Sequence, residues 1–160
     1  MFNLAIDSKL RGCDLVKIKV DEICDDLEPK RRCSLVQQKT GRPVTFEVSR
    51  ATRMVIWRWV QIGALSRNNF LFPSRTRESE HISTRQYARL VKGWVELAGL
   101  DRHIYGTHSL RRTKATMIYR QTKNIRAVQL LLGHTKLEST VRYLGIDVED
   151  ALEIAEAIEI

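Results

Sequence analysis

The sequence predicts a mainly α-helical domain with a small antiparallel β-sheet or hairpin, an α+β fold. Apolar residues recur at the three- and four-residue spacing of amphipathic helices along most of the chain. Only residues 21–48 show the two-residue alternation that is typical of strands. With 160 residues, 43% of them hydrophobic, the chain is long and apolar enough for one domain with its own core.

The N-terminal segment, residues 1–20, is predicted to be helical, with an interruption at Gly12. Arg11 lies where the chain is expected to turn, and Val20 is expected to begin a strand. Considered alone, Arg11 is most simply a surface residue, because arginines are mostly exposed.

A β-hairpin is predicted within residues 21–48. In its second run, polar residues separate the apolar residues Val44, Phe46 and Val48. Residues 38–43 read Gln-Lys-Thr-Gly-Arg-Pro, and the Thr-Gly pair and the proline are typical of a hairpin turn. Lys39 would project from the tip of this hairpin, where a lone lysine most simply serves solubility.

Two longer helices follow the hairpin. Residues 49–65 are predicted to form a helix that Ser49 caps. Its apolar line is expected to contain Val55, Trp59 and Ile62, widened by Ile56 and Val60. Residues 68–83 are interpreted as a loop, after which Thr84 opens a helix that Gly99 closes. We interpret the tryptophans and phenylalanines of this region as packing residues and not as platforms for stacked bases.

The last third of the chain predicts three short helices, at about residues 107–120, 124–132 and 137–145. Thr107 is the expected N-cap of the first. His108 and Arg111 are three residues apart and therefore share one face of its first turn. Free N–H groups and the helix dipole make such a helix start a natural site for a phosphate.

The two later helices carry a histidine and a tyrosine. Leu-Leu-Gly-His at residues 131–134 predicts a helix that ends at its glycine and leaves His134 clear of it. In the last helix, a stripe expected to face the core comprises Leu137, Thr140, Val141 and Leu144. Tyr143 flanks the stripe, so its hydroxyl could reach an outside partner, although a lone tyrosine there is most simply an ordinary half-exposed residue.

Basic residues outnumber acidic ones by 27 to 19, which gives a net charge of +8 and a pI near 9.7. Residues 148–160 contain five acidic residues and no lysine or arginine, so residues 1–147 carry a net charge of +13. This imbalance indicates a polyanionic partner, nucleic acid first and an anionic membrane surface second. No apolar run approaches the length of a membrane span, which sets the membrane alternative aside.

The cysteines and the missing nucleotide motif restrict the chemistry further. Three cysteines without CxxC spacing indicate reduced thiols in a cytoplasmic protein: Cys13, Cys24 and Cys33. The sequence contains no Gly-rich phosphate loop with a Lys-Ser/Thr ending, so nothing indicates ATP hydrolysis. The N-terminus lacks the basic and apolar regions of a signal peptide.

Residues 148–160 are predicted to form a C-terminal amphipathic helix with an apolar side and an acidic side. A helix this one-sided needs a surface against which to bury its apolar residues. That surface lies either in its own domain or on a neighbouring copy, and the sequence leaves both alternatives open.

Six scattered residues together meet the needs of phosphoryl transfer at a DNA phosphodiester without a metal or other cofactor: Arg11, Lys39, His108, Arg111, His134 and Tyr143. A tyrosine hydroxyl can attack phosphorus, but its pKa of about 10 requires help from a base or strong hydrogen bonds. Two arginines suit the negative charge of the pentacoordinate transition state. A lysine can protonate the departing 5′ oxygen, and either histidine can take the tyrosine proton. The product would be a covalent 3′-phosphotyrosine, whose bond keeps the energy needed for rejoining.

The sequence resembles the catalytic domain of the tyrosine recombinases, the phage-integrase family. Leu-Arg-Gly-Cys-Asp-Leu at residues 10–15, followed by Asp-Glu-Ile at 21–23, looks like the first arginine motif of that family. Gln-Lys-Thr-Gly at 38–41 is similar to the hairpin that carries its lysine. These two matches identify Arg11 and Lys39 as the corresponding residues.

Three further motifs follow in the family's order. His-Ser-Leu-Arg at 108–111 matches the His-x-x-Arg motif, and Leu-Leu-Gly-His at 131–134 matches the position that His or Trp holds. Tyr143 stands at the spacing of the nucleophile. The resemblance therefore implies that all six residues belong to one active site.

The resemblance covers residues 1–147, which it identifies as a catalytic domain with the family's fold. Family members normally carry an N-terminal helical domain that clamps DNA. We expect this chain to lack that domain and its first helix to be cut short, which makes it a fragment, an excised catalytic domain or a degraded element. The resemblance also implies double-stranded DNA as partner, a homo-tetramer on that DNA with the C-terminal segment packed on the next protomer, accessory DNA-bending proteins, and a cytoplasmic, nucleoid-associated location.

Two rival functions belong to other classes. A metal-dependent nuclease would use the acids Glu22, Asp25, Asp26 and Glu28, but these lie in one predicted strand-turn segment without distant partners. A basic DNA-binding or architectural module without activity would also fit the charge and the short helices. Type IB topoisomerases share the chemistry, and the motif spacings and the short hairpin favour a recombinase over them.

Overall fold

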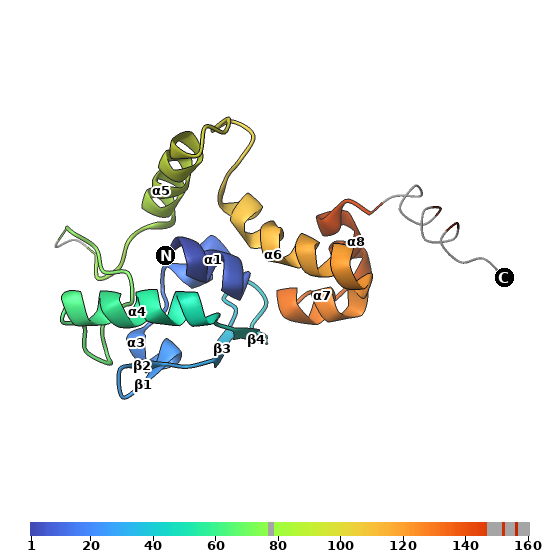
Figure 1. Ribbon diagram of the computed structural model, residues 1–160. Helices are drawn as coiled ribbons and strands as arrows, with labels where there is room; N and C mark the ends of the chain where they lie inside the picture. Colours follow the sequence, from blue (N-terminus) through green and yellow to red (C-terminus); the bar gives the residue numbers. More distant parts are fainter. Residues whose placement is uncertain (77–78, 147–151, 153–155, 157–160) are drawn as a thin grey trace.

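The computed structural model describes residues 1–76 and 79–146 and, beyond these, only Leu152 and Glu156. The predicted C-terminal helix at 148–160 therefore lies almost entirely outside the described residues. Helices and two small antiparallel sheets make up the described part (Figure 1). In chain order these are α1 (Phe2–Ser8), α2 (Gly12–Leu15), α3 (Val20–Ile23), β1 (Cys24–Asp25), β2 (Glu28–Pro29), β3 (Arg32–Val36), β4 (Pro43–Glu47), α4 (Arg50–Ile62), α5 (Thr84–Leu97), α6 (Thr107–Thr122), α7 (Ile125–Leu132) and α8 (Leu137–Leu144). The predicted mainly α fold with a small antiparallel hairpin is confirmed.

Strands β3 and β4 form the predicted hairpin. Their antiparallel register pairs Cys33 with Phe46 and Leu35 with Val44. These four side chains are buried, whereas their neighbours along each strand are exposed. The two-residue alternation thus lays one face of the hairpin against the core, as a half-buried sheet requires.

The helical segment predicted for residues 1–20, with its interruption at Gly12 and a turn near Arg11, is divided into α1 and α2. Helix α1 stops at Ser8 because Lys9 adopts a left-handed conformation with φ of 56°. Helix α2 begins after Arg11, which is extended and serves as its N-cap residue. The left-handed residue turns the chain, so Arg11 lies at a helix start and not in a helix interior.

Val20 begins helix α3, and the predicted strand at this position is wrong. The Glu22 carboxylate accepts a hydrogen bond from the backbone N–H of Lys19 at 2.7 Å, which caps the start of α3. A strand begins only at Cys24, where the two-residue β1 pairs with β2. A local cap therefore outweighs the β-branched residues that suggested a strand.

Helix α4 is capped as predicted, because Ser49 Oγ accepts a hydrogen bond from the backbone N–H of Thr52. Its buried face runs through Ile56 and Val60, whereas the predicted line is largely exposed: Val55 is 52%, Trp59 44% and Ile62 72% exposed. Of the predicted apolar face, only the widening residues Ile56 and Val60 are buried, and its central line is exposed. The interpretation of every tryptophan as a packing residue fails at Trp59.

The three C-terminal helices begin and end close to the predicted positions. The N-cap of α6 is Gly106 and not Thr107, and Ser109 Oγ accepts a hydrogen bond from the Gly106 N–H at 3.0 Å. Helix α7 ends, as predicted, at Gly133, which is left-handed with φ of 66°. In α8, Thr140 and Leu144 of the predicted stripe are buried, but Leu137 is exposed.

Two clusters of buried side chains organise the described residues. The larger cluster unites the helices from α1 to α5 with the β3–β4 hairpin. The smaller lies between α6, α7 and α8 and contains Ala115, Tyr119, Val128, Leu132 and Leu144. Helix α6 joins the two, since it packs against α1 and also contributes to the smaller cluster, and α7 lies against β4 (Figure 1). The junction of these clusters is where the predicted site residues meet.

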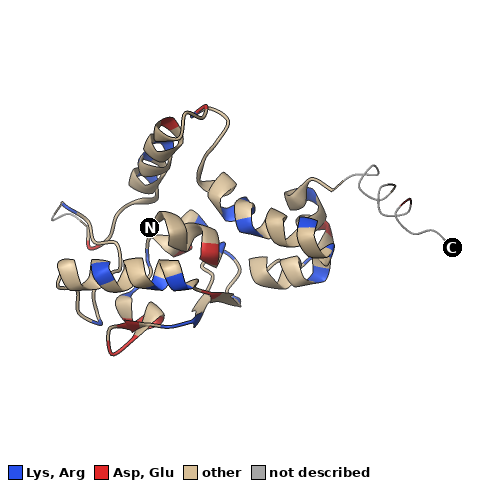
Figure 2. Cartoon of the chain, in the orientation of Figure 1, with Lys and Arg blue, Asp and Glu red and all other residues tan. Residues whose placement is uncertain are grey.

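Charge is unevenly distributed over this framework. Acidic residues gather at the β1–β2 turn, whereas lysines and arginines are spread more widely, over α4 to α8 and also between β2 and β3 (Figure 2). Within the described part of the chain, no helix is both long and apolar enough to cross a bilayer.

Candidate active site

The six predicted site residues come from five separate parts of the fold. Arg11 precedes α2, Lys39 lies in the turn between β3 and β4, and His108 and Arg111 lie near the start of α6. His134 follows α7, and Tyr143 lies in the last turn of α8. The structure brings four of them together around the junction of α6, α7 and α8: Arg11, Arg111, His134 and Tyr143. A fifth, His108, lines a pocket beside Tyr143.

The two arginines are linked through one backbone oxygen at the end of α7. Arg111 Nη2 donates to the Leu132 carbonyl oxygen at 3.0 Å, and Gln37 Nε2 donates to the same oxygen at 3.1 Å. Gln37 Oε1 in turn accepts a hydrogen bond from Arg11 Nη1 at 2.7 Å. A cation is favoured at this position, because the last carbonyls of a helix carry partial negative charge.

Arg111 is buried, with 3% of its surface exposed, and its Nη1 group has no hydrogen-bond partner within the described residues. Burial lowers the pKa of Arg111, and the charge of Arg11 acts in the same direction, while Tyr143 and Asp14 oppose the shift. Arginine nevertheless keeps its charge in proteins. A buried cationic donor without a partner is costly and suits a site that an anion completes.

Tyr143 packs among cationic and aromatic groups. The Arg111 and Arg112 guanidinium carbons lie 5.8 and 5.7 Å from the centroid of its ring, and the His134 ring meets it edge-on at 5.3 Å. The hydroxyl oxygen is buried and, among the described residues, has no hydrogen-bond partner. Arg111 influences the pKa of this phenol, yet the pair does not meet the geometry of a hydrogen bond.

The environment of Tyr143 therefore favours the protonated phenol. Burial raises the pKa of Tyr143, and the positive charges of Arg111, Arg112 and Arg11 oppose that rise without cancelling it. A nucleophilic role would need a base or an added hydrogen-bond partner, as for any tyrosine.

His134 is held beside the tyrosine by contacts from its own segment. Its Nδ1 lies 3.1 Å from Thr140 Oγ1, and Gln129 Nε2 donates to its carbonyl oxygen at 3.2 Å. Burial, together with the charges of Arg111 and Arg11, lowers the pKa of His134 to about 4. The imidazole is thus neutral near pH 7 and able to accept a proton.

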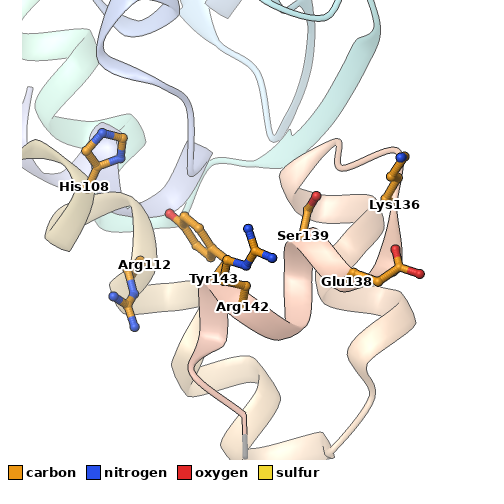
Figure 3. Close-up of a pocket in the computed structure, with 7 residues that line it drawn as sticks. All are labelled: His108, Arg112, Lys136, Glu138, Ser139, Arg142 and Tyr143. Atoms are coloured by element: carbon orange, nitrogen blue, oxygen red, sulfur yellow. The ribbon is translucent and has the colours of Figure 1, made fainter.

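An open pocket of about 900 Å³ adjoins the tyrosine (Figure 3). It is lined by His108, Arg112, Lys136, Glu138, Ser139, Arg142 and Tyr143. The hydroxyl end of Tyr143 is directed toward the side on which His108 lies (Figure 3). Three basic side chains and a histidine against a single carboxylate make this surface suited to an anionic ligand.

Lys39 is the residue that the structure does not bring to the others. It is exposed in the hairpin turn and makes no hydrogen bond or ion pair with any described residue. The turn itself is anchored, because the Gln38 N–H donates to Asp14 Oδ1 at 2.9 Å and Thr40 Oγ1 donates to Gln37 Oε1 at 3.0 Å. The side chain of Lys39 is therefore exposed, although the residues on both sides of it are held by hydrogen bonds.

Sequence reasoning missed Gln37, Asp14 and Arg112. The sequence does contain a signal for Gln37. It continues the alternating inward positions of Cys33 and Leu35, and a polar side chain on a buried face requires hydrogen-bond partners. Asp14 is buried and its Oδ2 has no hydrogen-bond partner among described residues. Nothing in the sequence distinguishes Arg112 from Arg111 except the motif spacing.

Three of the acids considered for a metal-dependent nuclease contact a backbone N–H or a basic side chain instead. Glu22 caps α3, Asp25 lies 3.1 Å from Lys30, and Asp26 lies 3.4 Å from Arg67. Within the described residues, no group of three or more His, Cys, Asp or Glu side chains is arranged to hold a metal ion.

The family model described as "Phage integrase family" matches residues 1–149, and the chain belongs to that family. The interpretation of the sequence as a member of the tyrosine recombinases is thereby confirmed.

Curated relatives agree with this assignment. The chain is 30% identical over 156 residues to a probable integrase/recombinase, YoeC, of Bacillus subtilis (strain 168), covering 97% of this chain and 80% of that protein. It is 29% identical over 151 residues to the tyrosine recombinase XerC of Caldanaerobacter subterraneus subsp. tengcongensis, covering 92% of this chain but only 40% of XerC. The chain thus spans most of one relative and less than half of the other.

Solved recombinase structures share the fold. The XerA recombinase superposes with a TM-score of 0.77 at 20% identity, over 97% of this chain and 55% of that one. The XerH site-specific recombinase bound to its difH substrate, in a pre-cleavage complex, gives a TM-score of 0.75 at 18% identity, over 96% of this chain and 44% of that one.

Proposed function

We propose that this chain is the catalytic part of a site-specific recombinase that cuts and rejoins double-stranded DNA through a covalent 3′-phosphotyrosine. The observation that carries the proposal is the pair of unpartnered polar atoms, Arg111 Nη1 and Tyr143 Oη, buried in one site. A phosphate oxygen would give each a hydrogen-bond partner and would bring phosphorus next to the phenol.

The chemistry assigns one role to each side chain. Tyr143 Oη forms a bond to phosphorus while the bond from phosphorus to the 5′ oxygen breaks. Arg11 and Arg111 bind the non-bridging oxygens, and each such donor typically contributes about 2.7–4 kcal/mol to the transition state. Lys39 gives a proton to the departing 5′ oxygen, and a histidine accepts the tyrosine proton. Attack by a 5′ hydroxyl on the phosphotyrosine reverses these steps and rejoins the strand.

Two features support a histidine in the role of base. The His134 ring touches the Tyr143 ring, and His108 lies on the side toward which the Tyr143 hydroxyl is directed (Figure 3). No step needs a metal ion, because arginines and a lysine supply the positive charge and the proton. The neighbouring basic surface would hold the DNA backbone on either side of the scissile phosphate.

The remaining assignments follow from the same proposal. Residues 1–147 act as the catalytic domain, and the segment 148–160 docks either in its own domain or on another copy in a DNA-bound tetramer. XerH is a site-specific recombinase bound to its difH substrate, and we propose double-stranded DNA as the partner of this chain. Accessory DNA-bending proteins and a cytoplasmic, nucleoid-associated location belong to the proposal in the same way.

Two observations favour a second candidate, a basic DNA-binding module without activity. The Tyr143 hydroxyl is buried, and Lys39 makes no hydrogen bond or ion pair with the other site residues. The recombinase proposal therefore requires DNA to expose the phenol and draw the hairpin turn inward.

Covalent capture separates the two candidates. The full chain is mixed, in EDTA, with a pool of randomised duplexes that carry a nick on one strand, and DNA that stays attached after SDS is recovered. A recombinase gives an adduct that Tyr143→Phe abolishes and that Tyr105→Phe, an exposed tyrosine, leaves unchanged. Salt-sensitive binding without any adduct would establish the non-catalytic module.

A further inference from the structure

The side chain of Gln37 connects three parts of the proposed active site that are far apart in the sequence. It is buried, with 1% of the residue exposed. Its Oε1 accepts hydrogen bonds from Arg11 Nη1 at 2.7 Å and Thr40 Oγ1 at 3.0 Å, and its Nε2 donates to the Leu132 carbonyl oxygen at 3.1 Å. One amide thus touches the first arginine, the hairpin turn that carries Lys39, and the end of α7.

The partners dictate which way this amide points. A guanidinium can only donate hydrogen bonds and a carbonyl oxygen can only accept them. The oxygen of Gln37 must therefore face Arg11, and its NH₂ group must face Leu132. A carboxylate of the same size would set an oxygen against the Leu132 carbonyl. An apolar side chain would remove the acceptor of Arg11 and Thr40 and leave the Leu132 oxygen with Arg111 as its remaining side-chain donor.

The backbone of Gln37 is fixed as firmly as its side chain. Its N–H donates to the Arg42 carbonyl oxygen at 2.9 Å, and its carbonyl oxygen accepts from the Gly41 N–H at 2.8 Å. On the other side, a Cβ placed on Gly133 would lie only 3.1 Å from the Gln37 amide. The amide is held between the hairpin and the end of α7, with little room to move.

Gln37 also links the two arginines to each other. Arg111 Nη2 donates to the same Leu132 oxygen at 3.0 Å, so hydrogen bonds run without interruption from Arg11 through Gln37 and Leu132 to Arg111. The positive charge of Arg11 contributes to lowering the pKa of Arg111, as expected for two like charges that repel each other. Without a restraint, their repulsion would drive the more exposed Arg11 outward.

We propose that Gln37 is a positioning residue for DNA cleavage, which sets the Arg11 guanidinium at the distance from Arg111 that a single phosphate requires. It acts through Arg11 and does not touch the reacting atoms. The inference rests on the proposed function and adds to it a residue outside the six derived from the sequence.

Single-turnover cleavage of a nicked duplex recovered by covalent capture tests this role. Gln37→Met keeps an unbranched side chain of similar length but removes the amide. We expect the cleavage rate of the full chain to fall on the order of 10²-fold, the loss typical of a reacting group displaced by about 1 Å. DNA affinity should stay within about threefold, since most phosphate contacts remain.

Gln38→Met is the matched control, because Gln38 is the adjacent glutamine, is exposed, and bonds only to Lys17 and the Cys13 carbonyl through its side chain. Its cleavage rate should equal that of the wild type. Gln37→Glu keeps the size of the side chain and the acceptor for Arg11 but replaces the donating NH₂ group by a second acceptor, so it serves as the second variant if Gln37→Met melts early in circular dichroism. We expect it also to cleave slowly, because its carboxylate pairs with Arg11 and repels the Leu132 oxygen.

A double-mutant cycle separates positioning from a general loss of structure. In an Arg11→Lys background, the group that Gln37 holds is gone, so Gln37→Met should cost less than about threefold more. A full additional loss in that background, or a wild-type rate for Gln37→Met alone, would overturn the proposal. If the wild-type chain forms no adduct with any duplex, the recombinase function fails and the role of Gln37 fails with it; an adduct formed equally fast by Gln37→Met removes only the role of Gln37.

Discussion

The ammonium group of Lys114 lies 2.6 Å from Asp7 Oδ1, and this contact ties α6 to α1. The same carboxylate accepts hydrogen bonds from Thr52 Oγ1 at 2.6 Å and from the Ser49 N–H at 3.0 Å. Burial alone would raise the pKa of Asp7, but the hydrogen bonds from Lys114, Thr52 and Ser49 lower it to about 2. Because α1 leads directly to Arg11 and α6 carries Arg111, this ion pair helps to fix one arginine against the other.

Lys114→Met should lower the free energy of unfolding by about 1–3 kcal/mol, because Asp7 stays buried with a charge that has lost its cation. Urea denaturation measures the change. Arg31→Ala provides the comparison, since the Arg31–Glu47 pair spans 3.3 Å between two side chains that are mostly exposed. It should change stability by no more than about 0.5 kcal/mol. An equal effect of both variants would contradict a special role for the buried pair.

Stability should decrease as pH falls from about 6.5 to about 4. The pKa of His134 is lowered from 6.5 to about 4 in the folded chain, so in this window the unfolded chain binds a proton that the folded chain does not. Denaturation at several pH values measures the slope. His134→Asn should flatten it, whereas His103→Asn, at an exposed position, should leave it in place. A slope that survives in His134→Asn would assign the effect to another group.

Arg111→Ala should reduce cleavage on the order of 10²–10³-fold, because it removes a charged donor aimed at the phosphate. DNA binding should remain, and it should still weaken steeply with salt, since many other basic residues contact the backbone. Cleavage and binding are measured on the same duplex at several salt concentrations. A parallel loss of both would mean that Arg111 only holds DNA.

Gly133→Ala should destabilise the chain by more than about 1 kcal/mol, because the residue has φ of 66° and its new Cβ would press on the Gln37 amide. Gly93→Ala is the matched substitution in the middle of α5, where a Cβ meets nothing within 4 Å. That change should stabilise by about 0.4–1 kcal/mol, since alanine restricts the unfolded chain and favours the helix. Thermal denaturation of the two variants should therefore shift in opposite directions.

The longer helices could be predicted from the sequence because each carries its own local signals. Ser49 caps α4, and Gly133 ends α7. The short helices carry fewer capping and terminating signals in their own sequence. The four residues that begin at Val20 form a helix whose start is capped by Glu22. The break at Lys9 depends on a left-handed backbone conformation that the sequence pattern does not predict.

The face of a helix was harder to predict than its existence. Two apolar stripes run along α4, and only the one through Ile56 and Val60 meets the core. Which stripe is buried depends on the elements that pack against it, and these are remote in sequence. The same limit applies to Trp59, whose indole N–H reaches the Leu71 carbonyl at 2.7 Å at a half-exposed position.

The identity of the candidate site residues came from motif spacing, while their arrangement came only from the fold. Spacing placed His108 beside Arg111 on α6, but it could not reveal that Arg111 and Gln37 share a partner. That partner is the main-chain oxygen of Leu132, and a pattern of side-chain types does not predict contacts to main-chain atoms.

The shared Leu132 oxygen has one more consequence, for how the chain tolerates change. Every residue type supplies the same oxygen, so replacing Leu132 by another side chain that α7 accepts would not remove the meeting point of the two networks. Adding or deleting a residue between Asn124 and Gly133 would rotate that oxygen away by about 100° of helix. A substitution at Leu132 that α7 accepts thus preserves the shared oxygen, whereas a change in the length of α7 would separate the two arginines.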